Sequence, residues 1–220
     1  MKSKNLKKKV AFEVLKFIPN EIFIGVGTGS TVTYLINYLK KIKNKIKGAV
    51  SSSYKTTMSL KKNGIKVVQL NSLDRLPLYI DSADEINNNM EMIKGGGAAL
   101  TREKILASAA DKFICIIDET KQVKTLGKFP LPIEVLPMSY RYVMRELKKI
   151  GGEVKKRSNI ITDNNNYILD ISKLCIVNPV DIENTINNIP GVISVGIFSR
   201  RKPDILLVST KKNVKKVFIN

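Results

Sequence analysis

The sequence predicts an α/β fold, in which a parallel β-sheet carries helices on its faces. Short apolar runs of strand character, such as residues 22–26 and 113–117, alternate with segments whose apolar residues recur at helical spacing. Turns rich in Gly, Ser and Thr join several of these runs to the next helix. The chain has 220 residues and is 43% hydrophobic, which is enough for one large domain, or for one domain and a smaller one.

The first part of the chain reads as alternating helices and strands. Apolar spacing predicts helices at residues 5–17, 32–39 and 56–63, and a further helix that begins near residue 98. Apolar runs of β-propensity predict strands at residues 22–26, 49–50, 65–70, 78–80 and 113–117. Ligands of open α/β sheets bind beyond the carboxyl ends of the strands, so the polar residues that follow these strands are site candidates: Thr28, Ser51, Asp81 and Asp118.

The second part of the chain has a different pattern. Prolines punctuate residues 129–137, FPLPIEVLP, which we interpret as a domain boundary. A small α+β unit of ferredoxin-like kind is then predicted, with helices at 142–150 and from Pro179 to before Pro190, and strands at 153–156, 167–171, 174–177 and 192–198. Residues 204–208 are expected to return to the large sheet, and residues 211–216 to form a solvated basic end. The predicted domains are therefore residues 1–129 plus 203–220, and residues 130–202.

The charge of the chain is strongly positive. There are 38 Lys and Arg against 19 Asp and Glu, a formal net charge of +19. Nucleic-acid binding is one explanation and stays open as an alternative. However, the lysines are scattered over the whole chain, and no stretch interleaves them with aromatic residues, which make up only 6%. We therefore expect no nucleic-acid partner, and a positive field that favours a small anionic substrate.

Histidine is absent, and this restricts the chemistry. Ser-His-Asp and Cys-His catalysis and every His-ligated metal site are excluded. A general base near neutral pH must then be Asp, Glu, Lys, Tyr or Cys. The two cysteines, Cys115 and Cys175, lie in apolar runs and are expected to be small core residues in a reducing compartment, with a disulfide between them as the alternative.

No targeting or membrane segment is visible. The basic N-terminus is not followed by an apolar segment, and no run of about 18 apolar residues occurs. We expect a soluble, cytoplasmic protein without a membrane partner.

The turn Gly27-Thr28-Gly29-Ser30-Thr31 stands between a predicted strand and a predicted helix. A helix N-terminus offers unpaired N–H groups and the positive end of the helix dipole, which suits a phosphate group. The alternative is that Ser30 and Thr31 only cap the helix. The spacing matches neither the dinucleotide fingerprint nor the Walker loop, so it does not support a dinucleotide or NTP site.

The stretch from residue 78 to residue 110 carries the densest chemistry. Asp81 and Asp84 follow a strand, Lys94 precedes three consecutive glycines, and Glu103 falls in the first turns of the next helix. Three glycines in a row cost stability unless the backbone adopts an unusual conformation there. An ordinary strand-turn-helix connection is the alternative. The combination instead suits proton transfer on a polar, hydroxyl-rich, anionic substrate.

These residues resemble the type A ribose-5-phosphate isomerases. The resemblance is carried by GVGTGST at residues 25–31, DSADE at 81–85 and KGGGAALTREKI at 94–105, and it covers nearly the whole chain. One departure is visible, because the acidic block of the family usually reads DGADE and Ser82 replaces its glycine. If that position requires a positive φ, Ser82 is strained.

The resemblance implies a fold, a reaction and partners. It implies a Rossmann-like large domain with a small α+β domain, assembled as a homo-oligomer, often a dimer. It implies interconversion of ribose 5-phosphate and ribulose 5-phosphate in the pentose phosphate pathway, with no metal and no organic cofactor. Such an isomerisation moves a proton between C2 and C1 through an enediolate, and one carboxylate can serve as the base.

The resemblance also implies roles for single residues. Glu103 would be the base, and Lys94 would stabilise the developing oxyanion with the N–H groups of Gly95, Gly96 and Gly97. Asp81 and Asp84 would hold sugar hydroxyls and help to open the furanose ring. The remaining substrate-binding candidates are Thr28, Gly29, Ser30 and Thr31 in the turn, Ser82 and Ala83 in the acidic block, and the cations Lys121 and Lys7.

A sugar-phosphate sensor on a similar scaffold is a second alternative. A sensor binds without turnover and would not need both Glu103 and Lys94. It would usually carry a DNA-reading module, for which this chain has no spare length.

Overall fold

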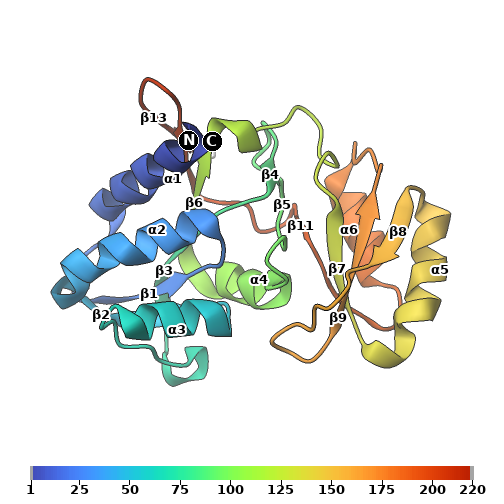
Figure 1. Cartoon of the computed structure of the whole chain (residues 1–220), viewed down its shortest axis with the longest axis horizontal. Helices are drawn as coiled ribbons and strands as arrows, with labels where there is room; N and C mark the ends of the chain where they lie inside the picture. The colour runs from blue at the N-terminus through green and yellow to red at the C-terminus, as the bar shows by residue number, and fades with distance from the viewer. Residues whose placement is uncertain (1, 219–220) are drawn as a thin grey trace. The chain divides into compact units, whose positions relative to one another are not determined.

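The computed structural model describes residues 2–218, whose contacts divide the chain into two compact units (Figure 1). Within the described range, the first unit comprises residues 2–83, 102–121 and 203–218. The second unit comprises residues 84–101 and 122–202. These bounds differ from the predicted domains, since residues 84–101 and 122–129 group with the second unit. The reason is a small antiparallel sheet that pairs residues 85–86 and 92–93 with residues 197–198.

The first unit is built on a six-stranded sheet of order β13-β12-β6-β3-β1-β2. All neighbouring strands are parallel except β13, which is antiparallel to β12. The strands are β1 (Ile22–Val26), β2 (Ile46–Ser51), β3 (Leu76–Asp81), β6 (Ala110–Asp118), β12 (Ile205–Ser209) and β13 (Val214–Phe218).

Helices pack against this sheet. Figure 1 shows α1 and α2 on the same side of the strands, and Leu60 of α3 belongs to the same apolar core as these two helices. The helices are α1 (Lys2–Glu13), α2 (Ser30–Leu39), α3 (Tyr54–Lys62) and α4 (Leu100–Ala109), with 3-10 turns η1 (Val14–Phe17), η2 (Lys40–Lys45), η3 (Leu70–Ser72) and η4 (Glu119–Lys121). Buried residues of α1, α2 and the strands form one apolar core, in which Val10, Leu35 and Ile24 are fully buried.

The second unit contains a four-stranded antiparallel sheet of order β10-β7-β9-β8. Its chain order, β7-α5-β8-β9-α6-β10, is that of a ferredoxin-like unit. Its elements are β7 (Leu131–Val135), η5 (Pro137–Ser139), α5 (Tyr140–Ile150), β8 (Glu153–Lys156), β9 (Tyr167–Ser172), α6 (Pro179–Asn187) and β10 (Val192–Val195). Apolar residues of both helices and of the sheet share one core. A separate three-stranded sheet pairs β4 (Glu85–Ile86), β5 (Met92–Ile93) and β11 (Ile197–Phe198).

The α/β class, the parallel sheet and the α+β unit are confirmed, but two predicted strands are wrong. Residues 65–70 form only one isolated bridge, between Val67 and Ala49 of the edge strand β2. Residues 174–177 likewise form one bridge, between Ile176 and Leu126. Both segments are apolar enough for a strand, but each meets a partner over a single residue, so no ladder forms.

Three further segments differ from the prediction. Residues 129–137, interpreted as a domain boundary, contain β7, one of the two inner strands of the four-stranded sheet. The strand expected at 192–198 is split at Gly196, where the chain passes from one sheet to another; a Cβ there would lie 2.5 Å from the carbonyl oxygen of Lys94. The basic end at 211–216 is largely exposed, yet residues 214–218 pair with β12 as an edge strand.

The two cysteines have different environments. Cys115 is buried in β6, as expected. Cys175 is exposed, which corrects the expectation of a core position, because its segment does not form a strand. Both thiols are free, so the disulfide alternative is excluded. Within residues 2–218 no helix combines the length and the apolar character that a membrane crossing requires.

Candidate active site

The turn after β1 leads directly into the N-terminus of α2. Gly29 stands at the N-cap with φ of +142°, a conformation that residues with a side chain rarely adopt. Ser30 is the first residue of α2, and Lys7 donates a 2.9 Å hydrogen bond from Nζ to its Oγ. Thr31 is buried one position further on. The structure therefore brings Lys7 from α1 to the N-terminus of α2. There the positive charge of the lysine and the positive end of the helix dipole both attract an anion.

Asp81, the last residue of β3, holds this turn in place. Its Oδ1 accepts hydrogen bonds from the backbone N–H groups of Thr28, at 3.1 Å, and Ser82, at 2.7 Å. Its Oδ2 accepts one from the Tyr79 hydroxyl at 2.5 Å. A Cβ on Gly27 would lie 1.9 Å from the carboxylate carbon, so only glycine leaves room there. With its side chain buried and three donors in place, Asp81 acts as an anchor for the turn.

The hydroxyl of Thr28 is directed into the protein. It lies 2.8 Å from the Ser52 hydroxyl and donates to Ser53 Oγ at 2.8 Å. Thr56 donates from its own hydroxyl to the carbonyl of Gly27 at 2.8 Å. The loop after β2 and the start of α3 therefore hold the turn from behind. The N–H groups of Gly27 and Thr28 donate to the Ile80 carbonyl and to Asp81, so the part of the turn with anion-binding chemistry is the backbone N–H groups of residues 29–31.

Tyr79 is a site residue that the sequence analysis missed. Its ring is fully buried, lies 5.0 Å from the ring of Phe113, and fits because position 25 is glycine, where a Cβ would lie 2.7 Å from the ring. Burial, followed by the charges of Asp81 and Glu103, holds the pKa of Tyr79 well above its usual 10.0. The available signal was the two-residue spacing to Asp81 in β3, which places both side chains on one face of the sheet.

Tyr79→Phe should change the alkaline stability of the protein. Folding raises the pKa of Tyr79, so the stability that its proton contributes is complete below about pH 10 and is lost as the pH rises further. The free energy of unfolding of the variant should therefore fall less steeply above about pH 10, by about 1.4 kcal/mol per pH unit. Urea unfolding at several pH values measures this, with the exposed Tyr142→Phe as the control. If the free energy of unfolding fell equally steeply with pH in Tyr79→Phe and in the wild type, the raised pKa of Tyr79 would be contradicted.

Glu103 lies in the first turn of α4 and is 2% exposed. Its charge acts on Tyr79, and so it belongs to the same cluster as Asp81 in the first unit. Ser82 does not have a positive φ, so the expected strain at that position is absent. Ala83 is buried, and Lys121 lies in η4, directly after β6 at the carboxyl edge of the sheet.

The second unit carries the triple-glycine loop. Asp84 accepts a 2.7 Å hydrogen bond from the N–H of Gly96, and a Cβ at Gly96 would lie 2.7 Å from that carboxylate. Gly95 has φ of +104°, and Ala98 closes the turn by donating to the Gly95 carbonyl at 3.0 Å. Of the three glycines only Gly95 has a positive φ, so the unusual backbone conformation expected of this loop is confined to one position. The N–H of Gly96 serves Asp84, which leaves Gly95 and Gly97 as possible oxyanion donors.

Arg157 is a second residue that the sequence analysis missed. It donates from one guanidinium nitrogen to the carbonyls of Gly95, at 3.2 Å, and Gly96, at 3.1 Å. Its other nitrogens pair with both carboxylate oxygens of Asp170, at 2.5 and 2.8 Å. The side chains of Arg157 and Asp170 are each only 19% exposed. Through Arg157, this bidentate ion pair fixes the carbonyl groups of the glycine loop. No local pattern could have indicated it, since about sixty residues separate the two partners.

Lys94 carries a buried positive charge beside that loop. The residue is 2% exposed, and its ammonium lies 5.5 Å from the centre of the Phe198 ring. Its backbone N–H donates to the Gly196 carbonyl at 2.9 Å, which fixes the start of the loop. A desolvated ammonium of this kind stabilises negative charge far better than an exposed one.

Each unit therefore holds part of the predicted set. The first unit gathers Lys7, Thr28, Gly29, Ser30, Thr31, Asp81, Ser82, Ala83, Glu103 and Lys121, and the second gathers Asp84, Lys94, Gly95, Gly96 and Gly97. Within residues 2–218 no group of three or more His, Cys, Asp or Glu residues has the arrangement of a metal site.

A comparison with models of protein families finds a match for this chain. The model described as ribose 5-phosphate isomerase A (phosphoriboisomerase A) matches residues 48–213 of the chain. The chain belongs to the ribose 5-phosphate isomerase A family. A ribose-5-phosphate isomerase A of Buchnera aphidicola subsp. Schizaphis graminum (strain Sg) is 55% identical over 215 residues, which are 98% of this chain and 98% of that protein.

Solved structures agree with this family. The crystal structure of ribose 5 phosphate isomerase A from Neisseria gonorrhoeae matches with a TM-score of 0.96 and 44% identity, over 98% of this chain and 97% of that chain. A D-ribose-5-phosphate isomerase in complex with phospho-erythronic acid matches with a TM-score of 0.95 and 38% identity, over 100% of both chains. This family member is an aldose–ketose isomerase of the pentose phosphate pathway, and it interconverts ribose 5-phosphate and ribulose 5-phosphate.

Proposed function

We propose that Glu103 is the base that moves the proton between C2 and C1 of the open-chain sugar. The observation that carries this proposal is the buried carboxylate in the first turn of α4, close to Tyr79, in a chain without histidine. The carboxylate takes the proton from C2, and the electrons of that bond form the C1–C2 double bond of an enediolate. The carboxylic acid then returns the proton to C1, while the O2 proton moves to O1 and leaves the ketone.

Lys94 is the proposed stabiliser of the oxyanion that forms on O1. Its ammonium is buried, and the rigid glycine loop beside it holds N–H groups in place before the reaction starts. Donors that need no reorganisation are worth most where charge develops. The Arg157–Asp170 pair serves this loop as a positioning element, since it contacts only the loop carbonyls and not the proposed reacting atoms.

The turn at residues 27–31 is the proposed phosphate site. The N-terminus of α2 supplies N–H groups and the positive dipole end, and Lys7 lies hydrogen-bonded to Ser30 there. Lys121 is proposed as the second cation for the same phosphate, because it follows the carboxyl end of β6 in the same sheet.

The two aspartates receive different proposed roles. Asp84 has one oxygen bonded to Gly96, so its other oxygen suits a sugar hydroxyl and the proton transfer that opens the furanose ring. Asp81 accepts three hydrogen bonds from its own unit, so we propose that it acts first as the anchor of the phosphate turn. Its contact with sugar hydroxyls, implied by the family resemblance, stays a prediction.

The ligand of one relative supports the enediolate step. Phospho-erythronic acid, which that isomerase binds, carries a carboxylate on a phosphorylated, hydroxylated chain. A carboxylate presents two oxygens and one negative charge, as the reacting end of an enediolate does. Tight binding of such an anion is expected of a site that complements the transition state. A sensor would have no use for a buried general base.

The direct experiment is a coupled assay for ribulose 5-phosphate formed from ribose 5-phosphate by the purified full chain. Turnover should persist after exhaustive treatment with a metal chelator, because carboxylate and ammonium groups suffice for the proposed steps. Activity that disappears with the chelator and returns with an added divalent cation would contradict the mechanism. Binding of ribose 5-phosphate without turnover would instead favour the sensor.

We further propose that the enzyme is a homodimer in the cytoplasm. The family resemblance supports the dimer, and the charged pentose phosphates that it converts do not cross membranes unaided. Sedimentation equilibrium should return about twice the 24.6 kDa chain mass. A single species at the chain mass would contradict the dimer.

A further inference from the structure

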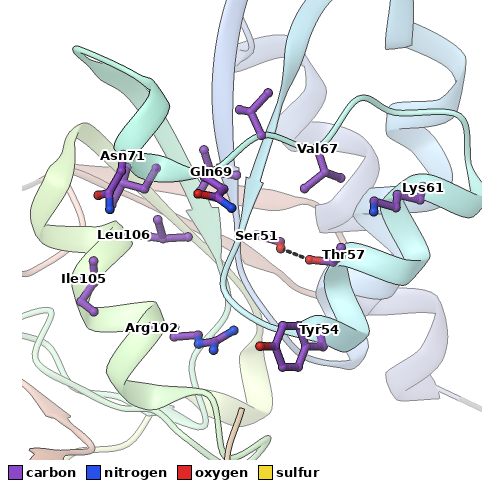
Figure 2. Close-up of a pocket in the computed structure, with 13 residues that line it drawn as sticks. Ser51, Tyr54, Thr57, Lys61, Val67, Gln69, Asn71, Arg102, Ile105 and Leu106 are labelled. Carbon is purple, nitrogen blue, oxygen red and sulfur yellow. Dashed lines mark hydrogen bonds between the residues drawn. The ribbon is translucent and has the colours of Figure 1, made fainter. Parts of the chain in front are cut away.

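A pocket lies in the first unit, outside the residues assigned to the reaction. It has a volume of about 670 Å³, within the usual range for small-molecule sites. Figure 2 shows its walls: α3 with Tyr54, Thr57 and Lys61, α4 with Arg102 and Ile105, and the segment that contains Gln69.

The lining of this pocket has the chemistry of an anion site with a flat hydrophobic end. Two cations, Lys61 and Arg102, and the amides of Gln69 and Asn71 contribute to it, whereas no Asp or Glu does. The Arg102 guanidinium lies over the Tyr54 ring, 4.7 Å from its centre. Tyr54 is 60% exposed and so offers the plane of an aromatic ring to a ligand.

The separation of the two ends sets the size of the ligand. Tyr54 and Lys61 lie seven residues apart on α3, which corresponds to about 10 Å along the helix axis. A planar ring at Tyr54 and Arg102 and a phosphate at Lys61 are therefore separated by roughly the length of a nucleoside monophosphate. A second copy of this chain is a poorer occupant, since a symmetric contact would bring like charges of Lys61 and Arg102 together.

We propose that the pocket between α3 and α4 binds a nucleoside monophosphate, with the ring beside Tyr54 and Arg102 and the phosphate at Lys61. The pocket is lined by residues that directly neighbour the proposed base and the hydroxyl network of Thr28. Arg102 directly precedes Glu103 in α4, and Ser51, which is hydrogen-bonded to Thr57, directly precedes Ser52 of the Thr28 network. A bound ligand therefore acts on the elements that hold the base and the phosphate turn, and it changes turnover. This second part rests on the proposed role of Glu103, whereas binding does not.

The test is calorimetric titration of the full chain with AMP, in the presence of saturating ribose 5-phosphate. The sugar phosphate matters because AMP contains a ribose 5-phosphate unit that could enter the active site. We expect saturable binding of AMP, with weaker binding of adenosine or inorganic phosphate alone. Lys61→Gln should raise the Kd about fivefold, and Ile105→Glu, which places a negative charge on the wall, by more than about tenfold. The matched control is Lys62→Gln, which removes the same charge from the next residue of α3, outside the pocket lining.

The outcomes separate the two parts of the proposal. If ribose 5-phosphate displaced AMP, AMP would bind in the active site, and the proposal would be overturned. Absent binding, or equal losses in Lys61→Gln and Lys62→Gln, would overturn it too, the latter by showing general attraction to a chain of charge +19. Binding with no change in kcat at saturating substrate would overturn the coupling to turnover.

Discussion

Glu103→Gln is expected to lower kcat by about 10²–10⁴-fold while the protein still binds ribose 5-phosphate. The amide has the shape of the carboxylate but cannot take the C2 proton near neutral pH. Glutamine has nearly the same size as glutamate, so the substitution adds no volume at this buried position of α4 and should leave the fold intact. The coupled assay measures kcat, and calorimetric titration with ribose 5-phosphate measures binding separately.

A matched control separates the base from a general loss of charge. Glu146→Gln on α5 removes the same charge from a surface ion pair with Lys149, and its kcat should stay within about twofold of the wild type. Near-normal turnover by Glu103→Gln would remove Glu103 from the role of base. Loss of binding together with turnover would instead assign it to substrate positioning.

Gly27→Ala is expected to destabilise the protein by about 3 kcal/mol and to reduce activity at least about 100-fold. The new Cβ would lie 1.9 Å from the carboxylate carbon of Asp81, which real atoms do not tolerate. Asp81 must then move, and it gives up its hydrogen bonds to Thr28 and Ser82. Urea unfolding measures the free energy, and the coupled assay measures the loss of the phosphate turn, chiefly as a higher KM.

A double-mutant cycle with Asp81→Ser tests the cause. The serine removes the atoms that the new methyl group meets, so the double variant should lose less stability than the two single variants together. The expected difference is about 1–3 kcal/mol. If the losses of stability in the two single variants simply added, the methyl group would act elsewhere and Asp81 would not anchor this turn.

Motifs with short spacing were the part of the site that could be predicted from the residues. The acidic block, the triple glycine and the turn at residues 27–31 are each a short run of neighbouring residues, so a local pattern reveals them. The roles of single atoms could not be predicted in this way. The substrate-binding role expected of Thr28 stays a prediction, and no local pattern could show that its hydroxyl contacts Ser52 and Ser53. Whether the hydroxyl groups of Thr28, Ser52, Ser53 and Thr56 face a ligand or one another depends on how the loops pack.

The strands show the same limit. The strand at 22–26 and the run ending at Asp118 were predicted because a buried strand of a parallel sheet is apolar throughout. Residues 65–70 carry the same signal but form only a single bridge at the sheet edge. Residues 214–218 carry a weak, basic pattern and nevertheless pair along their length with β12. Strand formation thus depends on a partner of matching length, which propensity does not encode.

The sequence by itself determined the α/β class, the order of the main elements, the absence of imidazole chemistry and the set of carboxylates, lysine and glycines to which the proposed proton transfer assigns roles. These features follow from composition and from spacings of a few residues, which covalent geometry and helix or strand periodicity convert directly into local structure. Only the tertiary structure decided that Tyr79 holds Asp81, that Arg157 clamps the glycine loop, and that Lys7 reaches Ser30. Such contacts join side chains from different elements, and they exist only after the chain has folded and excluded water from between them.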